Sequence, residues 1–92
     1  MTDAERLAEI FKLFSTEARI RILQHLKRGA TTVVKLTTGL GITQSATSQH
    51  LRVLRDARLV THYKSGTNVY YNLDKQNIER THKAISGLFS EK

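Results

Sequence analysis

Residues 43 to 55 read Thr-Gln-Ser-Ala-Thr-Ser-Gln-His-Leu-Arg-Val-Leu-Arg, and this stretch decides the fold because it has the pattern of an amphipathic helix. With about 100° of rotation per residue and Gln44 as the origin, an arc of roughly 0 to 140° holds only polar side chains. Gln44, Ser45, Ser48, Gln49 and Arg52 lie in this arc. The opposite arc holds Thr47, His50, Leu51, Leu54 and Ala57. We expect a helix over residues 43 to 57 with one face in the core and the polar face exposed.

The polar face of this helix has the chemistry that base reading requires. Hydroxyl and amide groups can donate and accept hydrogen bonds at base edges, whereas an idle surface helix is usually filled with Glu and Lys. We therefore assign base contacts to Gln44, Ser45, Ser48 and Gln49, and a phosphate contact to Arg52. The alternative is a polar helix that faces only water.

The size and charge of the chain fit a nucleic-acid partner. Its 92 residues predict a single small domain over residues 1 to 92, with a modest core that dimerisation would enlarge. The formal charge is +7, from 15 Lys and Arg against 8 Asp and Glu. Such a balance favours a polyanionic partner, although many other basic proteins share it.

The composition also excludes several classes of protein. The absence of Cys removes disulfides, thiolate metal sites and thiol switches. No apolar run approaches the ~18 residues of a membrane span, and the first residues do not resemble a leader peptide, so we expect a cytoplasmic protein without a membrane partner. An enzyme is disfavoured, because no Gly-rich phosphate loop follows a strand and no Ser, His and Asp are paired by context.

The segments before the reading helix predict three more helices. Leu7, Ile10, Phe11 and Phe14 indicate a helix over about residues 4 to 14 capped by Asp3. A second begins at Ser15 or Thr16 and runs to Lys27 and Arg28 before Gly29. Thr31 or Thr32 caps a short third helix that ends by Gly39 or Gly41.

The turn after this third helix links it to the helix that begins after residue 43. Residues 39 to 41 are expected to form a tight turn, Ile42 is expected to be an apolar plug, and Thr43 is expected to cap the next helix. Two short helices joined by such a turn form a helix-turn-helix.

After Ala57 the pattern changes to that of a β-hairpin. Residues 59 to 63 and 69 to 73 are rich in β-branched and aromatic side chains, and residues 64 to 68 separate them. Asp74 then caps a last helix in which Ile78, Ile85, Leu88 and Phe89 recur at helical spacing. The expected fold is mainly α with a small hairpin, a winged helix-turn-helix of four helices, two strands and a fifth helix.

Several of these segments together resemble the ArsR/SmtB family of winged-helix repressors. Residues 14 to 23 are similar to the family's second helix, residues 41 to 57 to its recognition helix, and residues 69 to 73 to the end of its wing. The resemblance covers about Leu7 to Leu88. It implies a homodimer on an inverted-repeat operator, with repression relieved by an inducer, and wing contacts to DNA from Lys64 and Thr67.

The family's dimer forms through the first and last helices. The resemblance therefore implies interface residues among the apolar positions of those helices, some of which must instead face the subunit's own core. The candidates are Leu7, Ile10, Phe11, Phe14, Ile78, Ile85, Leu88 and Phe89.

Three positions depart from the family pattern. Glu17 replaces a common Pro, which a first helical turn tolerates, and Thr67 and Asn68 replace a common Arg at the wing tip. Arg58 stands where a Gly often closes the recognition helix. Either Arg58 accepts a left-handed backbone at a cost of about 1 kcal/mol, or the helix ends differently.

The family's metal sites lack their ligands in this chain. Residues 32 to 36 contain no soft ligand, and of the site across the closing helices only Asp74 remains, with Gln76, Gly87 and Ser90 at the other positions. We expect Asp74 to act as a helix cap, His50 to be hydrogen bonded inside the fold, and Glu79 with His82 to be an exposed pair. We expect no metal or cofactor, and the inducer is unknown. The remaining alternative is a winged-helix module for architecture or protein interaction.

Overall fold

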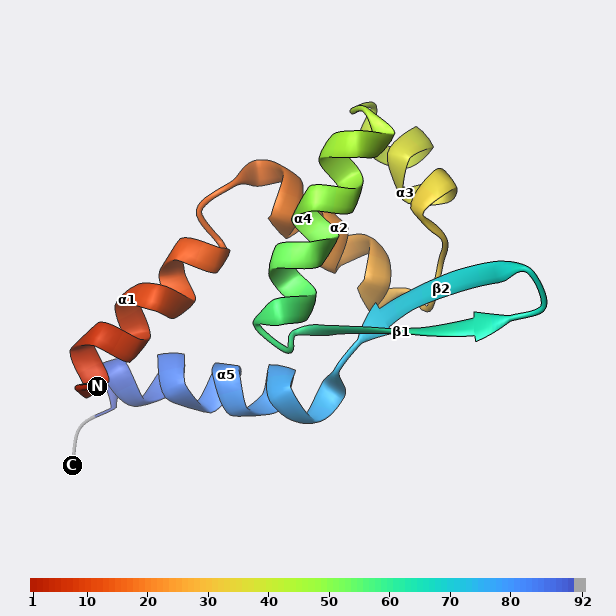
Figure 1. The fold of residues 1–92 in the computed structure, drawn as a ribbon. Coiled ribbons are helices and arrows are strands. Elements are labelled where there is room, and N and C mark those ends of the chain that lie inside the picture. The colour runs from red at the N-terminus through yellow and green to blue at the C-terminus, as the bar shows by residue number, and fades with distance from the viewer. Residues whose placement is uncertain (91–92) are drawn as a thin grey trace.

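The computed structural model describes residues 1–90 and shows, in that range, the expected order of helices and strands. The elements are α1 (Asp3–Leu13), α2 (Glu17–Lys27), α3 (Val33–Leu40), α4 (Gln44–Asp56), β1 (Val60–Ser65), β2 (Asn68–Leu73) and α5 (Lys75–Phe89). Figure 1 shows α1 and α5 side by side at one end, with the hairpin projecting from the other. The fold is a winged helix-turn-helix, mainly α with one hairpin, as the sequence predicts.

The core lies under the helix-turn-helix. Its buried apolar residues come from α2, α3, α4 and the start of β1, and they are Ile22, Leu26, Leu36, Leu40, Leu51, Leu54, Leu59 and Val60. The predicted plug, Ile42, is partly buried against this cluster. Since the cluster joins α4 to α2 and α3, burial of apolar surface fixes the position of α4.

Side-chain caps set the helix starts. Thr16, Thr32, Thr43 and Asp74 cap α2, α3, α4 and α5, which confirms the sequence interpretation. The cap expected at Asp3 was wrong. Thr2 caps α1 in a capping box, in which its hydroxyl accepts from Glu5 N while its own N–H donates to the Glu5 carboxylate.

The turn between α3 and α4 is shorter than expected. Gly39 is still helical, and α3 ends at Leu40, with Gly41 at a left-handed φ of 70° as its C-cap. A single glycine in this conformation ends the helix, so a turn over residues 39 to 41 is not needed. At the end of α4, Arg58 has a φ of 63°, which is the first of the two alternatives that the sequence left open.

The hairpin is also tighter than expected. β1 and β2 pair antiparallel from Val60 with Leu73 to Ser65 with Asn68, so Gly66 and Thr67 alone form the turn. The predicted five-residue connection over residues 64 to 68 was wrong, because Gly66 at φ 63° permits a two-residue turn. Beyond the hairpin, Thr31 and Tyr71 exchange backbone hydrogen bonds of 3.0 and 2.7 Å, which ties the start of α3 to the wing.

Candidate nucleic-acid interface

Polar contacts hold the inner face of α4 in register with α3. Thr47 is fully buried, at 0% exposure, and its hydroxyl donates to the Thr43 carbonyl at 3.0 Å. Its oxygen accepts a hydrogen bond of 2.9 Å from the Thr37 hydroxyl on α3. The Thr43 hydroxyl in turn accepts from Ala46 N at 3.0 Å. Buried hydroxyls with partners hold a unique geometry, so the two helices of the motif form one rigid unit.

The outer face of α4 is open to solvent. The five side chains assigned to DNA on this helix are all exposed, and they are Gln44, Ser45, Ser48, Gln49 and Arg52. Because the opposite face is anchored in the core, this polar face is presented at a fixed angle. Such a helix has the shape and the donors and acceptors to enter a major groove.

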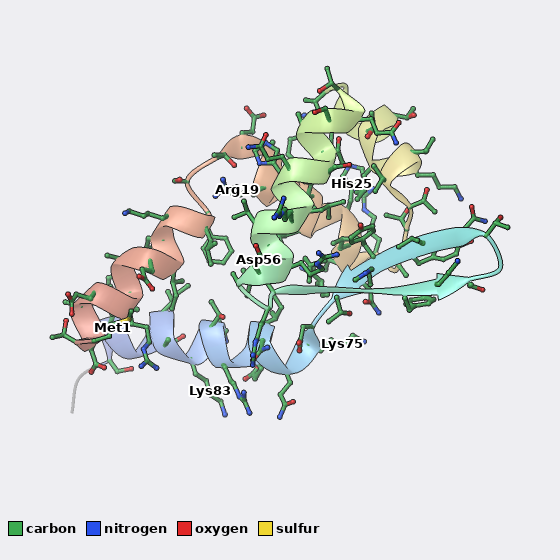
Figure 2. The ribbon with its side chains drawn as sticks, viewed as in Figure 1. Met1, Arg19, His25, Asp56, Lys75 and Lys83 are labelled. Atoms are coloured by element: carbon green, nitrogen blue, oxygen red, sulfur yellow. The ribbon has the colours of Figure 1, made fainter. Side chains whose placement is uncertain are left out.

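A second contact joins α4 to α2 through His50. Arg19 Nε donates to His50 Nδ1 at 3.3 Å, and Figure 2 shows Arg19 beside α4. Burial lowers the pKa of His50 below its ordinary value of 6.5, and the charge of Arg19 lowers it further. The expectation that His50 is hydrogen bonded inside the fold is confirmed.

Arg21 makes a contact that sequence reasoning missed. Its guanidinium donates from Nη1 to the Leu40 carbonyl at 3.2 Å and from Nη2 to the Gly39 carbonyl at 3.3 Å. The carbonyls at the end of a helix lack partners within it, so a cation there is favourable. The sequence shows a basic residue one turn into α2, where it can face a neighbouring helix. No sequence pattern, however, identifies the carbonyl groups that this residue contacts.

The hairpin carries the two wing residues in exposed positions. Lys64 lies within β1, opposite Val69, and Thr67 lies in the turn. Cross-strand aromatic pairs stiffen the strands: His62 stacks on Tyr71 at a centroid distance of 5.5 Å, and Tyr63 on Tyr70 at 5.6 Å. Arg55 Nη1 lies 3.3 Å from His62 Nε2, which links α4 to the base of the wing.

The candidate dimer residues divide into two groups. All five of the partly buried candidates are half-buried, and of these Ile78 and Phe14 pack against the subunit's own core, whereas Leu7, Ile10 and Ile85 lie outside it. Phe11, Leu88 and Phe89 are 42%, 50% and 79% exposed. Neither α1 nor α5 has a buried residue. These two helices therefore leave apolar side chains uncovered in a single chain.

The structure assigns other roles to the residues considered as metal ligands. Asp74 Oδ1 accepts from Asn77 N at 3.2 Å, which confirms its capping role. His82 and Glu79 are exposed, and the ring of another histidine, His25, packs against Gly39. Within residues 1–90, no three His, Asp or Glu side chains are grouped as a metal site would require.

No helix within residues 1–90 combines the length and the apolar character that a membrane crossing requires.

Comparison with known proteins identifies the family of this sequence. Residues 16–62 match the family described as "Bacterial regulatory protein, arsR family". The chain is 30% identical over 91 residues to the transcriptional repressor SmtB homolog of Synechocystis, covering 99% of this chain and 69% of that protein. It is 38% identical over 82 residues to the arsenical resistance operon repressor of Bacillus subtilis, covering 88% and 71%.

Solved structures share the fold over most of the chain. A crystal structure of a possible transcriptional regulator for arsenical resistance superposes with a TM-score of 0.80 at 34% identity, covering 89% of this chain and 85% of that one. HlyU from Vibrio cholerae superposes with a TM-score of 0.75 at 29% identity, covering 99% and 100%. The helix-turn-helix and wing described above are thus those of an established regulator fold.

Proposed function

This chain belongs to the arsR family of bacterial regulatory proteins, and on that premise we propose that it is a dimeric repressor that reads an inverted-repeat operator. The family consists of DNA-binding transcription regulators and not of enzymes. The proposal goes further in naming α4 as the reading helix, the wing as a backbone contact and a second copy as the partner. The cytoplasmic location expected from the sequence goes with this DNA partner and is proposed with it.

One observation carries the proposal: the outer face of α4 presents hydroxyl and amide groups from a helix whose other face is fixed. Glutamine amides suit adenine, and serine hydroxyls can serve several base edges. Arg52 on α4 and Lys64 on the wing are exposed cations that could contact phosphates.

The uncovered apolar side chains of α1 and α5 support the dimer. Phe11, Leu88 and Phe89 sit on helices that have no buried residue in one chain. A second copy packed on these helices would remove this apolar surface from water. Leu7, Ile10 and Ile85, which are half-buried, would complete the same interface.

The known inducer sites of the family have no counterpart here, so we propose a regulator that responds to neither metals nor thiols through them. Asp74, the one retained ligand type, is engaged as a cap. Zinc titration of an operator complex tests this point, since release of the DNA at stoichiometric zinc would contradict it.

The experiment that tests the function measures binding to duplex DNA by fluorescence anisotropy at several salt concentrations. A sequence-specific regulator keeps a preferred duplex in the presence of competitor DNA, while its affinity falls steeply with salt. Equal affinity for every duplex supports the architectural alternative, and no affinity for duplex DNA supports a protein-interaction module.

A further inference from the structure

A cationic pocket lies between α1, α5 and the turn that follows α4. Its volume is about 240 Å³. Ile10, Ala57 and Ala84, all half-buried, give it an apolar floor, and Arg6, Arg58 and Arg80, all exposed, stand around it. All of its lining residues come from one chain, and Ile10 also belongs to the proposed dimer interface, so the pocket borders that interface.

The charge of this pocket is unbalanced. Three guanidinium groups from three different elements line one cavity, and no Asp or Glu is among its lining residues. Like charges gathered at one site repel one another, and an anion that binds between them removes that repulsion. Guanidinium groups are also the side chains best suited to carboxylate and phosphate oxygens, which they bind through paired N–H donors.

Asn77 holds one of these arginines in place. Its amide nitrogen donates to Asp74 Oδ2 at 3.1 Å, and its oxygen accepts from Arg80 Nη1 at 3.3 Å. The Asp74 carboxylate also accepts from Asn77 N, so it is engaged in capping α5. A guanidinium group has five N–H donors, so the contact with Asn77 leaves Arg80 able to bind a ligand.

Arg58 keeps a side chain where the backbone favours glycine. Its φ of 63° is in the left-handed region, and the turn would be relaxed by a residue without a Cβ. Arg58 provides the positive charge on the side of the pocket that is formed by the end of α4. The chain therefore keeps a strained backbone at Arg58, and the side chain at this position lines the same cavity as Arg6 and Arg80.

We propose that this pocket binds a small organic anion that carries two or more carboxylate groups. The separated guanidinium groups suit several oxyanions on one skeleton, and the apolar floor suits the carbon atoms between them. The pocket volume of about 240 Å³ leaves room for a compact polycarboxylate.

Because of where the pocket lies, binding of the anion would alter operator affinity. This part of the inference rests on the proposed DNA-binding function. Ala57 is the C-cap of α4, and the backbone of Leu59 bonds to Leu54 on one side and to Asp74 on the other. An anion that joins Arg6, Arg58 and Arg80 would tie the end of the reading helix to α1 and α5. Its binding would change the distance and angle between reading helices in a dimer, and hence operator affinity.

Calorimetric titration with citrate, without DNA and at constant ionic strength, tests the pocket. Wild-type protein should bind citrate saturably and more tightly than acetate or inorganic phosphate. Arg58→Gly and Arg80→Gln should each weaken binding by roughly tenfold or more, since each removes charged hydrogen bonds. Lys75→Gln, which removes the same charge from an exposed site on α5 outside the pocket, should leave the affinity unchanged.

The outcomes separate the parts of the inference. Absence of saturable citrate binding, or equal binding by all three variants and wild type, overturns the pocket. Phosphate binding as tight as that of citrate overturns the polycarboxylate class. If citrate binds at the pocket but operator affinity is the same with and without it, the regulatory link is wrong. Failure of citrate-free protein to prefer any duplex counts against the proposed function and not against the pocket.

Discussion

Arg19 Nε donates a hydrogen bond of 3.3 Å to His50 Nδ1, and this contact joins α2 to α4. The bond requires an unprotonated nitrogen on His50, because Nδ1 is the acceptor. Protonation would replace an attractive contact with two neighbouring cations. The position of α4 against α2 is thereby linked to the charge state of one imidazole.

We expect the free energy of unfolding to fall as the pH drops below about 6.5. The pKa of His50 is lowered in the folded protein by burial and by Arg19, so the unfolded chain binds a proton at pH values where the folded chain does not. The stabilisation is present above the ordinary pKa of 6.5 and is lost between that value and the lower folded value. Urea unfolding at a series of pH values on both sides of that ordinary pKa measures the slope.

The control for this prediction keeps the hydrogen bond from Arg19 but replaces the imidazole of His50 with a group that cannot be protonated. In His50→Asn the amide oxygen can accept from Arg19, and the slope in this pH range should become shallower than in wild type. His82→Asn, at an exposed site on α5, should retain the wild-type slope. An unchanged slope in His50→Asn would show that another group controls the pH dependence.

Thr47→Val should destabilise the protein by about 1 to 3 kcal/mol, because it preserves shape but removes two buried hydrogen bonds. Thr47 donates to Thr43 and accepts from Thr37. Thr38→Val, on the exposed side of α3, should change stability by less than about 0.5 kcal/mol. Chemical denaturation compares the two variants, and equal stabilities would contradict a structural role for the Thr37–Thr47 pair.

Local chemistry explains why much of this fold could be predicted from sequence. The caps at Thr16, Thr32, Thr43 and Asp74 act within three residues of themselves, and the inner face of α4 follows helical spacing. The errors were also local. A competing cap at Thr2 displaced Asp3, and the left-handed φ of Gly66 shortened the hairpin turn.

Contacts between distant residues could not be predicted in the same way. Arg19 and His50 are 31 positions apart, and Thr31 meets Tyr71 only after the wing has folded back on α3. The sequence showed that Arg58 departs from the family pattern, but only the structure brings it to the same cavity as Arg6 and Arg80. Likewise, only packing separates Ile78, which faces the core, from the exposed Phe89.

Gln49→Ala should relax the preference for one base position in each half-site and weaken binding to the preferred duplex by about 1 to 3 kcal/mol. Gln49 is exposed on the outer face of α4. The matched control is Gln76→Ala, an exposed glutamine on α5, which should bind as wild type does. Titrations against a library of single-base changes test the prediction, and an unaltered preference in Gln49→Ala would remove this residue from the reading surface.

Lys64→Ala should weaken binding to all duplexes by the same factor and leave base preference intact, because a phosphate contact carries no sequence information. The slope of log affinity against log salt should become shallower by roughly one for each phosphate that the wing no longer neutralises. Lys83→Ala removes the same charge from α5, where Figure 2 shows Lys83 directed away from α4. Equal salt slopes in the two variants would argue against a wing contact at Lys64.

The central claim is that two copies of the α4 face read successive major grooves, and sequencing the duplexes that the purified protein retains from a random library tests it most directly. We predict enrichment of an inverted repeat whose half-sites lie about 10 base pairs apart, or a multiple of that, centre to centre. Retention of duplexes without any shared motif, or of a single unpaired half-site, would contradict the account.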